Sequence, residues 1–434
     1  MKIMFVSLGC DKNLVDTEMM LGQLHSRGYE FTDDENEADA VVVNTCCFIH
    51  DAKQESVDTL LEMAELKKNG RCRFLIACGC LAQRYRQEII DEIPEVDAVV
   101  GTSAYDKIAD TLDELVNKQG DGINCFEDIN RLPQTHDRRI VTTGGYYEYL
   151  KIAEGCDKCC TYCIIPKVRG SYRSVPMDEL IKQAEDLAEQ GVKELILVAQ
   201  ETSLYGTDLY GEKSLHRLLH ELAAIDGIEW IRILYCYPEE IDDTLIQAIK
   251  SEPKVCHYLD LPIQHANDAI LKRMGRRTTK QDLIDIVKKL RSEIPDICLR
   301  TTLITGFPGE TKEQHEEVLD FIDELEFDRL GAFTYSADED VKAARRDAVM
   351  ELQQEISADR SAEVVGRTLK VMIEGKLADE DVYVGRTYRD APNVDGYVFV
   401  NTDAQLMSGD FIPVKITASD NYDLIGEPDY EFAE

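Results

Sequence analysis

Short apolar runs alternate with amphipathic helical segments along most of this chain, and this order restricts the fold to parallel sheets covered by helices. Four such runs lie within residues 1–118: Ile3 to Val6, Ala40 to Val43, Phe74 to Ala77 and Ala98 to Val100. After the first run, leucines on one helical face predict a helix that begins near Asn13 and ends at Gly28. Residues 1–118 are therefore predicted to form an open parallel sheet with helices on its faces.

A second alternation of strands and helices begins near residue 147. The predicted strands are Tyr149 to Ala153, Glu194 to Ala199, Trp230 to Tyr235, Tyr258 to Leu261, Leu299 to Ile304 and Arg329 to Tyr335. A capping box from Thr311 to Gln314 precedes one of the helices. Six βα units are too few to close an eightfold barrel, so residues 147–365 are predicted to form a partial (βα)6 barrel. Its site is expected at the C-terminal ends of the strands.

The remaining segments differ from these two regions. Residues 119–146 are polar, turn-rich and without periodicity, which is typical of a linker. A helical segment at about Met350 to Val365 leads into residues 366–434, where short β-rich runs predict a small β-barrel. The predicted class is α/β with three domains and one linker.

Composition and charge restrict the location and the partners. The chain has 434 residues, and its apolar N-terminus is too short for a signal sequence, so we expect a cytoplasmic protein that does not bind membranes. Acidic residues number 84 against 48 basic residues, for a net charge of −36. This charge repels a nucleic-acid backbone and attracts a basic protein. Fourteen cysteines in a reducing compartment favour metal or redox chemistry over disulfides.

Three cysteines directly after the first strand of the partial barrel have the spacing C-x3-C-x2-C. They are Cys156, Cys160 and Cys163. Three thiolates can hold three irons of a four-iron cluster and leave the fourth open to a substrate, whereas closed clusters have four cysteine ligands. A zinc knuckle or buried free thiols are the alternatives, but no Cys or His follows before His216. Cys159 is treated as a bystander, because using it would make Cys160 redundant.

Three further cysteines each follow a predicted strand of the N-terminal sheet: Cys10, Cys46 and Cys80. The C-terminal ends of parallel strands open on the same side of a sheet, where helix N-termini favour a thiolate. These cysteines are therefore expected to converge on a second three-cysteine site. Cys47 and Cys78 are rival ligands, and a buried cysteine can also serve as a small hydrophobic residue.

The sequence around these cysteines resembles the methylthiotransferases, a family of radical S-adenosylmethionine enzymes. The resemblance is carried by residues 7–16, 44–46, 79–85 and 198–202, which read SLGCDKNLVD, NTC, GCLAQRY and VAQET. It implies two 4Fe-4S clusters. Cys10, Cys46 and Cys80 would hold an auxiliary cluster, and Cys156, Cys160 and Cys163 would hold the cluster that binds S-adenosylmethionine.

The resemblance also implies a reaction and three further binding residues. One S-adenosylmethionine methylates a sulfur at the auxiliary cluster, and a second yields the radical that takes hydrogen from the β-carbon of a target aspartate. Tyr162 would lie by the adenine, Gln200 near the ribose, and Gly306 where the backbone approaches the nucleoside. His265 is a candidate base, although a single His after a strand is more often structural. No catalytic residue is assigned beyond the cluster ligands.

The substrate depends on the branch of this family. Some branches modify an adenosine in transfer RNA, and another branch modifies an aspartate of ribosomal protein S-twelve. The motifs of this chain resemble those of the ribosomal-protein branch. The last region resembles a TRAM domain, usually a nucleic-acid-binding module, but residues 376–434 contain 13 acidic against 4 basic residues, a net of −9. Such a charge suits a basic protein rather than RNA. We therefore predict ribosomal protein S-twelve and an electron donor as partners. A transfer-RNA adenosine methylthiotransferase and a non-catalytic iron-sulfur carrier are the alternatives.

Overall fold

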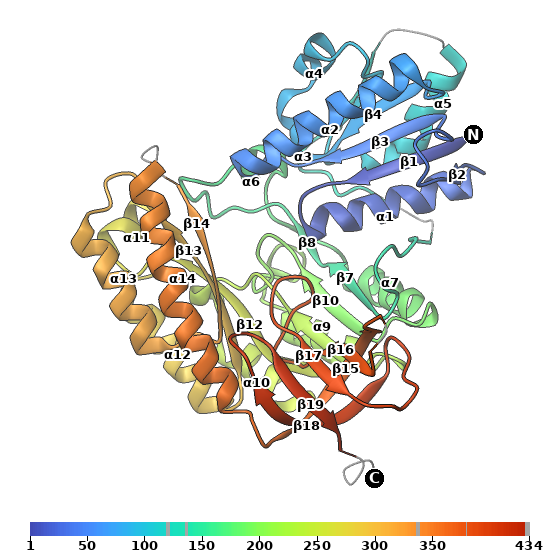
Figure 1. The fold of residues 1–434 in the computed structure, drawn as a ribbon. Coiled ribbons are helices and arrows are strands. Elements are labelled where there is room, and N and C mark those ends of the chain that lie inside the picture. Colours follow the sequence, from blue (N-terminus) through green and yellow to red (C-terminus); the bar gives the residue numbers. More distant parts are fainter. Residues whose placement is uncertain (119–121, 135–137, 336–338, 379, 430–434) are drawn as a thin grey trace. The chain divides into compact units, whose positions relative to one another are not determined.

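The structure is a computed structural model that describes residues 1–118, 122–134, 138–335, 339–378 and 380–429 (Figure 1). It divides into two compact units. The first unit contains residues 1–142, 149–175 and 198–200, and the second contains residues 143–148, 176–197 and 201–434. The predicted radical S-adenosylmethionine cysteines thus belong to the same unit as the N-terminal sheet, although the sequence placed them in separate domains.

The first unit is built on a six-stranded parallel sheet with the order β2-β1-β3-β4-β5-β6. Its strands are β1 (Lys2–Ser7), β2 (Glu30–Phe31), β3 (Ala40–Thr45), β4 (Phe74–Cys78), β5 (Ala98–Val100) and β6 (Ile123–Cys125). The four predicted strands are confirmed. The two strands that sequence patterns missed, β2 and β6, lie at the edges of the sheet and have two and three residues, too few for a periodic signal. β6 lies within the segment predicted to be a linker.

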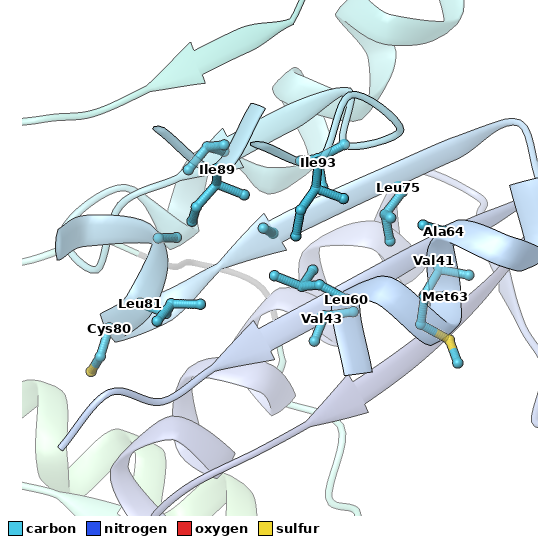
Figure 2. Packing of buried hydrophobic residues seen from close by; sticks show 14 of the residues in the cluster. Val41, Val43, Leu60, Met63, Ala64, Leu75, Cys80, Leu81, Ile89 and Ile93 are labelled. Carbon is cyan, nitrogen blue, oxygen red and sulfur yellow. The ribbon is translucent and has the colours of Figure 1, made fainter. Parts of the chain in front are cut away.

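Helices cover both faces of this sheet. They are α1 (Asp11–Ser26), α2 (His50–Asn69), α3 (Gly79–Tyr85), α4 (Gln87–Glu92) and α5 (Ile108–Lys118), with a 3-10 turn, η1 (Tyr105–Lys107). One core contains buried side chains of α2 and the central strands, among them Leu60, Met63, Val41, Val43 and Leu75 (Figure 2). A second core, on α1 and α5, contains Met20, Leu24, Ile108, Val42 and Ile76. Burial on both faces explains why β3 is apolar without alternation.

A segment of the central region completes the first unit. It contains a two-stranded antiparallel sheet of β8 (Ala153–Glu154) and β9 (Arg173–Ser174), and the short helix α6 (Ile165–Val168). The C-x3-C-x2-C cysteines lie in the loop between β8 and α6.

The second unit contains a six-stranded sheet with the order β14-β13-β12-β11-β10-β7. The strands are β7 (Tyr147–Lys151), β10 (Glu194–Val198), β11 (Trp230–Ile233), β12 (Val255–Gln264), β13 (Cys298–Thr305) and β14 (Arg329–Thr334), and β7 contains residues of both units. Strand order follows chain order and the sheet stays open, which confirms the predicted partial barrel.

Helices connect successive strands of this sheet. They are α7 (Met177–Glu189), α8 (Thr207–Tyr210), α9 (Leu215–Ala223), α10 (Asp243–Ser251), α11 (Asp268–Met274), α12 (Lys280–Glu293) and α13 (Lys312–Leu325), with a 3-10 turn, η2 (Pro238–Glu240). The predicted capping box at the start of α13 is confirmed: the Thr311 hydroxyl accepts from the Gln314 amide, and the Gln314 side chain accepts from the Thr311 amide.

A long helix, α14 (Glu339–Ala362), leads into a closed five-stranded barrel with the order β15-β16-β17-β19-β18. Its strands are β15 (Thr368–Lys376), β16 (Val382–Arg386), β17 (Val398–Asn401), β18 (Phe411–Ser419) and β19 (Leu424–Pro428). Valines and isoleucines fill the interior, among them Val371, Ile373, Val398, Val400 and Val414. The predicted small barrel is confirmed, and α14 begins 11 residues before its predicted start at Met350.

Buried ion pairs join this barrel to the parallel sheet of the same unit. Glu194 of β10 accepts a hydrogen bond from Arg232 of β11 at 2.7 Å and another from Arg386 of β16 at 2.7 Å. Two further pairs cross in the same way: Arg329 with Asp390 at 2.5 Å, and Arg389 with Asp328 at 2.9 Å. The barrel is therefore part of the core of the second unit.

No helix in the described ranges is long and apolar enough to cross a bilayer.

Candidate functional site

The ends of three neighbouring strands bring Cys10, Cys46 and Cys80 to one edge of the first sheet. Cys10 immediately precedes α1, Cys46 follows β3, and Cys80 lies in the first turn of α3, after β4. A Cβ atom added to Gly9 would lie only 2.8 Å from the Cys46 Cβ, so the segments of Cys10 and Cys46 touch. Burial raises the pKa of the Cys46 and Cys80 thiols, and a negative charge on Cys10 adds to both shifts, which shows that the three side chains are near one another.

A glycine turn positions the third cysteine. Gly79 forms a parallel bridge with Thr45, and its φ is +88°. A Cβ there would lie 2.2 Å from the Asn44 side-chain oxygen and 2.6 Å from the Thr45 carbonyl oxygen. Only glycine allows this approach, which places Cys80 one residue beyond a backbone contact with the Cys46 strand.

The environment of Cys80 suits a thiolate that ligates iron. Burial raises the pKa of the Cys80 thiol to about 12, while the nearby Arg169 guanidinium acts against this shift. The Nε of Arg169 donates to the Cys80 Sγ at 3.3 Å. A buried thiol with a cationic donor becomes a thiolate once a metal binds, because a coordinating thiol is deprotonated. The residues present therefore fit the auxiliary cluster that the sequence predicts.

The two rival cysteines differ in their surroundings. Cys78 packs in the core of α1 and α5, whereas Cys80 packs in the core of α2. The Cys78 thiol donates to the Val43 carbonyl at 3.5 Å. Cys47 lies beside Cys46, and burial raises the pKa of the Cys47 thiol. Cys78 is therefore packed in the core of α1 and α5 and hydrogen-bonded there, whereas Cys47 lies close to the predicted ligands.

The second triad lies in the loop between β8 and α6. The Cys156 amide donates to the Gly170 carbonyl at 3.1 Å, and the Cys163 amide donates to the Cys160 carbonyl at 3.0 Å. Cys156 and Cys160 are buried and Cys163 is half-buried. Cys159 is exposed, with a φ of +54° that turns the backbone at this residue. These positions support the predicted choice of ligands and the exclusion of Cys159.

Burial dominates the protonation of this second triad. It raises the pKa of the Cys163 thiol to about 11, with the Ile165 amide acting against the shift and a charge on Cys160 adding to it. In the described ranges, no three His, Cys, Asp or Glu side chains are close enough to hold a single metal ion. A four-iron cluster spaces its sulfur ligands more widely than one ion does. The two three-cysteine sites stay predictions.

The predicted nucleotide-binding residues are Tyr162, Gln200 and Gly306, and the contacts of Gln200 and Gly306 show how their loops are held. The Gln200 side chain accepts from the Gly155 amide at 2.8 Å and donates to Glu154 at 3.0 Å, so it fixes the backbone directly before Cys156. Tyr162 is half-buried in the same loop. Gly306 belongs to the second unit, has a φ of +69° and donates its amide to Glu310 at 2.5 Å. The roles of Tyr162, Gln200 and Gly306 toward S-adenosylmethionine stay predictions.

Sequence reasoning overlooked Glu310, which holds the Gly306 loop. Its carboxylate accepts from the amides of Gly306 and Phe307 and lies 3.2 Å from Arg345. Two imidazoles approach it, His265 at 3.6 Å and His315 at 3.5 Å. Burial would raise the pKa of Glu310, but the imidazoles and Arg345 hold this pKa well below its usual range.

His265 is itself fixed, because its Nδ1 accepts from the Asn267 amide at 2.9 Å. This contact agrees with a structural histidine rather than a base. The glycine-rich stretch GFPGE, residues 306–310, was the sequence signal for this anchored loop.

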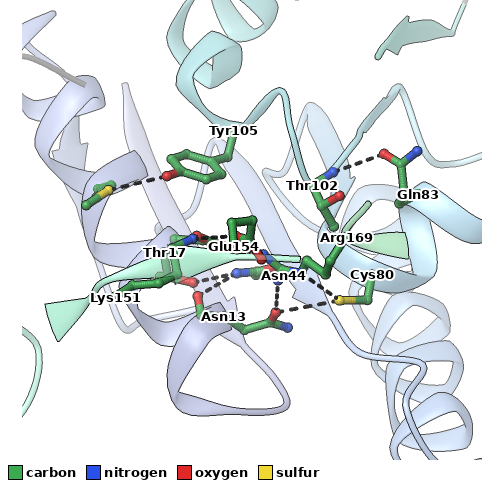
Figure 3. A network of polar contacts seen from close by, with 12 residues as sticks. Asn13, Thr17, Asn44, Cys80, Gln83, Thr102, Tyr105, Lys151, Glu154 and Arg169 are labelled. Carbon is green, nitrogen blue, oxygen red and sulfur yellow. Dashed lines mark hydrogen bonds and ion pairs between the residues drawn. The ribbon is translucent and has the colours of Figure 1, made fainter. Parts of the chain in front are cut away.

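Sequence reasoning also missed a buried charge network in the first unit. It joins Asp16 of α1, Lys151 of β7, Glu154 of β8 and Arg169. Figure 3 shows Lys151, Glu154 and Arg169. The available signal was the presence of the charged residues Lys151 and Glu154 among the apolar and aromatic residues of 149–154.

Three family profiles match the chain in turn. Residues 2–101 match the Uncharacterized protein family UPF0004, residues 150–322 match the Radical SAM superfamily, and residues 365–428 match the TRAM domain. Together they match three successive parts of the chain.

Full-length relatives carry the name ribosomal protein uS12 methylthiotransferase RimO. The protein of that name from Lachnoclostridium phytofermentans is 60% identical, over 98% of this chain and 99% of the relative. A second from Clostridioides difficile is 49% identical over the whole of both chains.

Solved structures share the fold at low sequence identity. The radical S-adenosylmethionine methyltransferase TsrM from Kitasatospora setae, with cobalamin and a [4Fe-4S] cluster bound, aligns with a TM-score of 0.56 and 13% identity, covering 85% of this chain and 80% of TsrM. The cobalamin-dependent S-adenosylmethionine radical enzyme OxsB aligns with a TM-score of 0.53 and 14% identity, covering 82% of this chain and 56% of OxsB.

Proposed function

Because this chain belongs to the ribosomal protein uS12 methylthiotransferase family, we propose that it transfers a methylthio group to that ribosomal protein. The acceptor we propose is the β-carbon of an aspartate. The observation that carries the proposal is 60% identity over nearly the entire length of a relative with this name. It is supported by the radical SAM profile and by two cysteine triads in one unit.

The chain's own residues would hold and orient the reacting groups. Cys10, Cys46 and Cys80 would hold one 4Fe-4S cluster, and Cys156, Cys160 and Cys163 would hold the other, with one iron of each left without a protein ligand. When bound, these clusters and S-adenosylmethionine supply the radical and the sulfur that an unactivated C–H bond requires.

Two anchors in the structure prepare the chain for these groups. Gln200 and Glu154 fix the backbone before Cys156, which limits how far this cysteine loop can move. Glu310 fixes the Gly306 loop, where a nucleoside would approach the backbone. Loops held in this way lose little further conformational freedom when they bind a ligand.

The charge of the barrel supports a basic protein partner over RNA. Several of its acidic side chains are exposed: Glu380, Asp381, Asp403, Asp420 and Glu427. Arg386 and Arg389, which could otherwise contact phosphates, are buried in ion pairs with Glu194 and Asp328. Binding RNA depends on exposed cations that displace counterions.

The proposal is tested with anaerobically reconstituted protein, S-adenosylmethionine, a chemical reductant and isolated uS12. We expect 5'-deoxyadenosine to be released and one aspartate of uS12 to gain a methylthio group, both detected by mass spectrometry. The C156A/C160A/C163A variant is the control, and it should produce neither. An iron-sulfur carrier would release no 5'-deoxyadenosine from the wild-type protein. Modification of transfer RNA in place of uS12 would favour the nucleic-acid branch.

We expect the acidic barrel surface to guide uS12 to the enzyme. Asp379 lies outside the described residues, but its neighbours Glu380 and Asp381 are exposed. Replacing the three by Asn, Gln and Asn should slow uS12 modification severalfold and leave uncoupled S-adenosylmethionine cleavage unchanged. Charges further apart than about 8 Å are largely screened at physiological ionic strength, so added salt should reduce the difference from wild type.

A charge-matched control comes from α2, where Asp51, Glu55 and Glu62 are also exposed. Neutralising these three should leave uS12 modification near the wild-type rate. The recognition hypothesis fails if both sets of substitutions slow the reaction equally, or if wild-type protein binds transfer RNA more tightly than uS12.

A further inference from the structure

Two cations and two anions are buried together beside the predicted auxiliary site. The Arg169 guanidinium donates to Asp16 at 2.7 Å and to Glu154 at 3.0 Å, and Lys151 contacts the same two carboxylates. All four residues are at most 6% exposed. Because the charges balance, the network is neutral as a whole, and burying it is feasible only with this complete pairing.

One end of Arg169 reaches the auxiliary cysteines. Its Nε donates to the Cys80 Sγ at 3.3 Å, and its terminal nitrogen donates to the Asn13 side-chain oxygen at 2.5 Å (Figure 3). Asn13 in turn donates to the carbonyls of Leu8 and Thr45, at 2.9 and 3.1 Å. These carbonyls belong to the segments just before Cys10 and Cys46. Arg169 is thereby fixed against all three ligand segments.

Arg169 is also connected to the second cysteine loop, through Glu154 and Gln200. Glu154, which accepts from Arg169, also accepts from Gln200 at 3.0 Å, and Gln200 accepts from the Gly155 amide at 2.8 Å. Gly155 directly precedes Cys156. The guanidinium therefore lies in a continuous chain of polar contacts between the two triads of the first unit.

A permanent cation at this position has a specific electrostatic effect. Arg stays protonated in proteins, so its hydrogen bond to a ligand sulfur is present at every working pH. Reducing an iron-sulfur cluster adds negative charge that is shared with its thiolates. A cationic donor stabilises that charge more in the reduced than in the oxidised form, and hydrogen bonds to sulfur are one of the factors that set cluster potentials.

We propose that Arg169 is a positioning residue for the auxiliary cluster: it holds Cys80 in place as a ligand and raises the reduction potential of the cluster bound by Cys10, Cys46 and Cys80. This inference rests on the proposed function, because it requires that second cluster. Lys151 provides a matched comparison. It shares both carboxylates with Arg169, but its remaining contact is with the ring of Tyr105.

The test uses full-length protein in the C156A/C160A/C163A background, so that only the auxiliary cluster can bind. The midpoint potential is measured by redox titration followed by electron paramagnetic resonance, for R169Q, R169K and K151M added to this background. We expect R169Q to lower the reduction equilibrium constant about tenfold, a shift of about 59 mV to more negative potential for one electron. R169K should shift it less, since it keeps the charge and loses the fork. K151M should shift it least.

Cluster content separates the possible outcomes. Loss of the cluster in R169Q but not in K151M would support the positioning role. The effect of Arg169 on the midpoint potential would then be measured in R169K instead. Equal potentials in all three variants and the background, or equal cluster loss in R169Q and K151M, would overturn the inference. If the background protein itself holds no iron, the proposed second cluster is absent, and the failure belongs to the proposed function instead.

Discussion

Each cysteine triad combines buried thiols with at least one that solvent can reach. Cys10 is exposed beside the buried Cys46 and Cys80, and Cys163 is half-buried beside Cys156 and Cys160. Burial raises the pKa of several of these thiols, so without metal they stay protonated near neutral pH. Cluster assembly should therefore release protons and become more favourable as pH rises.

We predict two independent clusters with separate ligands. Replacing Cys156, Cys160 and Cys163 together by Ala should leave about half of the iron and sulfide of the wild-type protein, because each triad can hold one four-iron cluster. Iron and acid-labile sulfide are measured per chain after reconstitution. C159A is the control and should keep the full content. A triple variant without iron, or with all of it, would contradict the two-site assignment.

Both triads could be proposed from the sequence. One has a local ligand spacing, C-x3-C-x2-C, and the cysteines of the other each follow a strand of the same parallel sheet. Arg169 could not be predicted in this way. Its partners Asn13, Asp16 and Cys80 lie between 89 and 156 positions away in the chain. No pattern in one segment indicates a contact at such a separation, so the network became visible only in the fold.

At the scale of elements, the turn between β4 and α3 determines where Cys80 lies. Gly79 has a positive φ and close backbone neighbours. Gly28, just after α1, has a similar φ of +84°, but a Cβ there would meet nothing within 4 Å. The two glycines share a left-handed φ and differ in the space around them, which makes them a useful pair for substitution.

We predict that G79A destabilises the protein by about 2–5 kcal/mol, from the left-handed conformation together with overlap against Asn44 and Thr45. G28A should cost only about 1–2 kcal/mol, because the conformational term acts alone. Urea denaturation measures both, and iron analysis should show that G79A also loses the auxiliary cluster. Similar costs for the two substitutions would show that the turn tolerates a side chain.

Elements with strong periodicity were predicted well, and short ones were not. All four apolar runs of the first sheet became strands, as did the six runs of the second sheet. Central strands such as β3, β4 and β10 are buried along their whole length, which explains their continuous apolar sequence. β2 and β6 are held by pairing with a neighbour rather than by their own composition. The predicted helix near Met350 covered only the second half of α14, which begins at Glu339.

At the scale of the whole molecule, buried ion pairs fix the barrel to the parallel sheet of the second unit. Glu194 lies between Arg232 and Arg386, and all three side chains are fully buried. The only tryptophan of the chain, Trp230, packs edge-to-face against Phe411 of the barrel at 4.8 Å between ring centroids. Its fluorescence therefore reports directly on this interface.

We predict that R386A destabilises the second unit by about 3–5 kcal/mol, because it leaves Glu194 with half of its pairing in a buried site. Urea denaturation followed by Trp230 fluorescence should show the loss. Lys370 of β15 provides a control: it pairs with Glu229 across the same interface, but both side chains are about half exposed. K370A should cost less than about 1 kcal/mol. Equal costs would mean that burial does not decide the strength of these pairs.

The same pair makes stability depend on pH in a defined direction. Burial would raise the pKa of Glu194, but Arg386 and Arg232 lower it below its ordinary value. The stabilisation is therefore present above the unfolded pKa of about 4.3 and is lost as pH falls through the lower folded pKa. The difference in unfolding free energy between wild type and E194Q should be constant above about pH 5 and shrink below about pH 4. A constant difference down to pH 3 would contradict this assignment.

The buried arginines of the barrel also limit how this enzyme can be re-engineered. Exchanging residues 366–434 for the barrel of a relative with another substrate would remove Arg386, Arg389 and Asp390 from their partners in the sheet. A chimera joined at this boundary would then fail to fold, because buried charges would lose their partners. Its substrate-binding surface would not change that outcome. A successful exchange must therefore also supply matching residues at positions 194, 328 and 329. The barrel and its charged partners in the sheet have to be exchanged together.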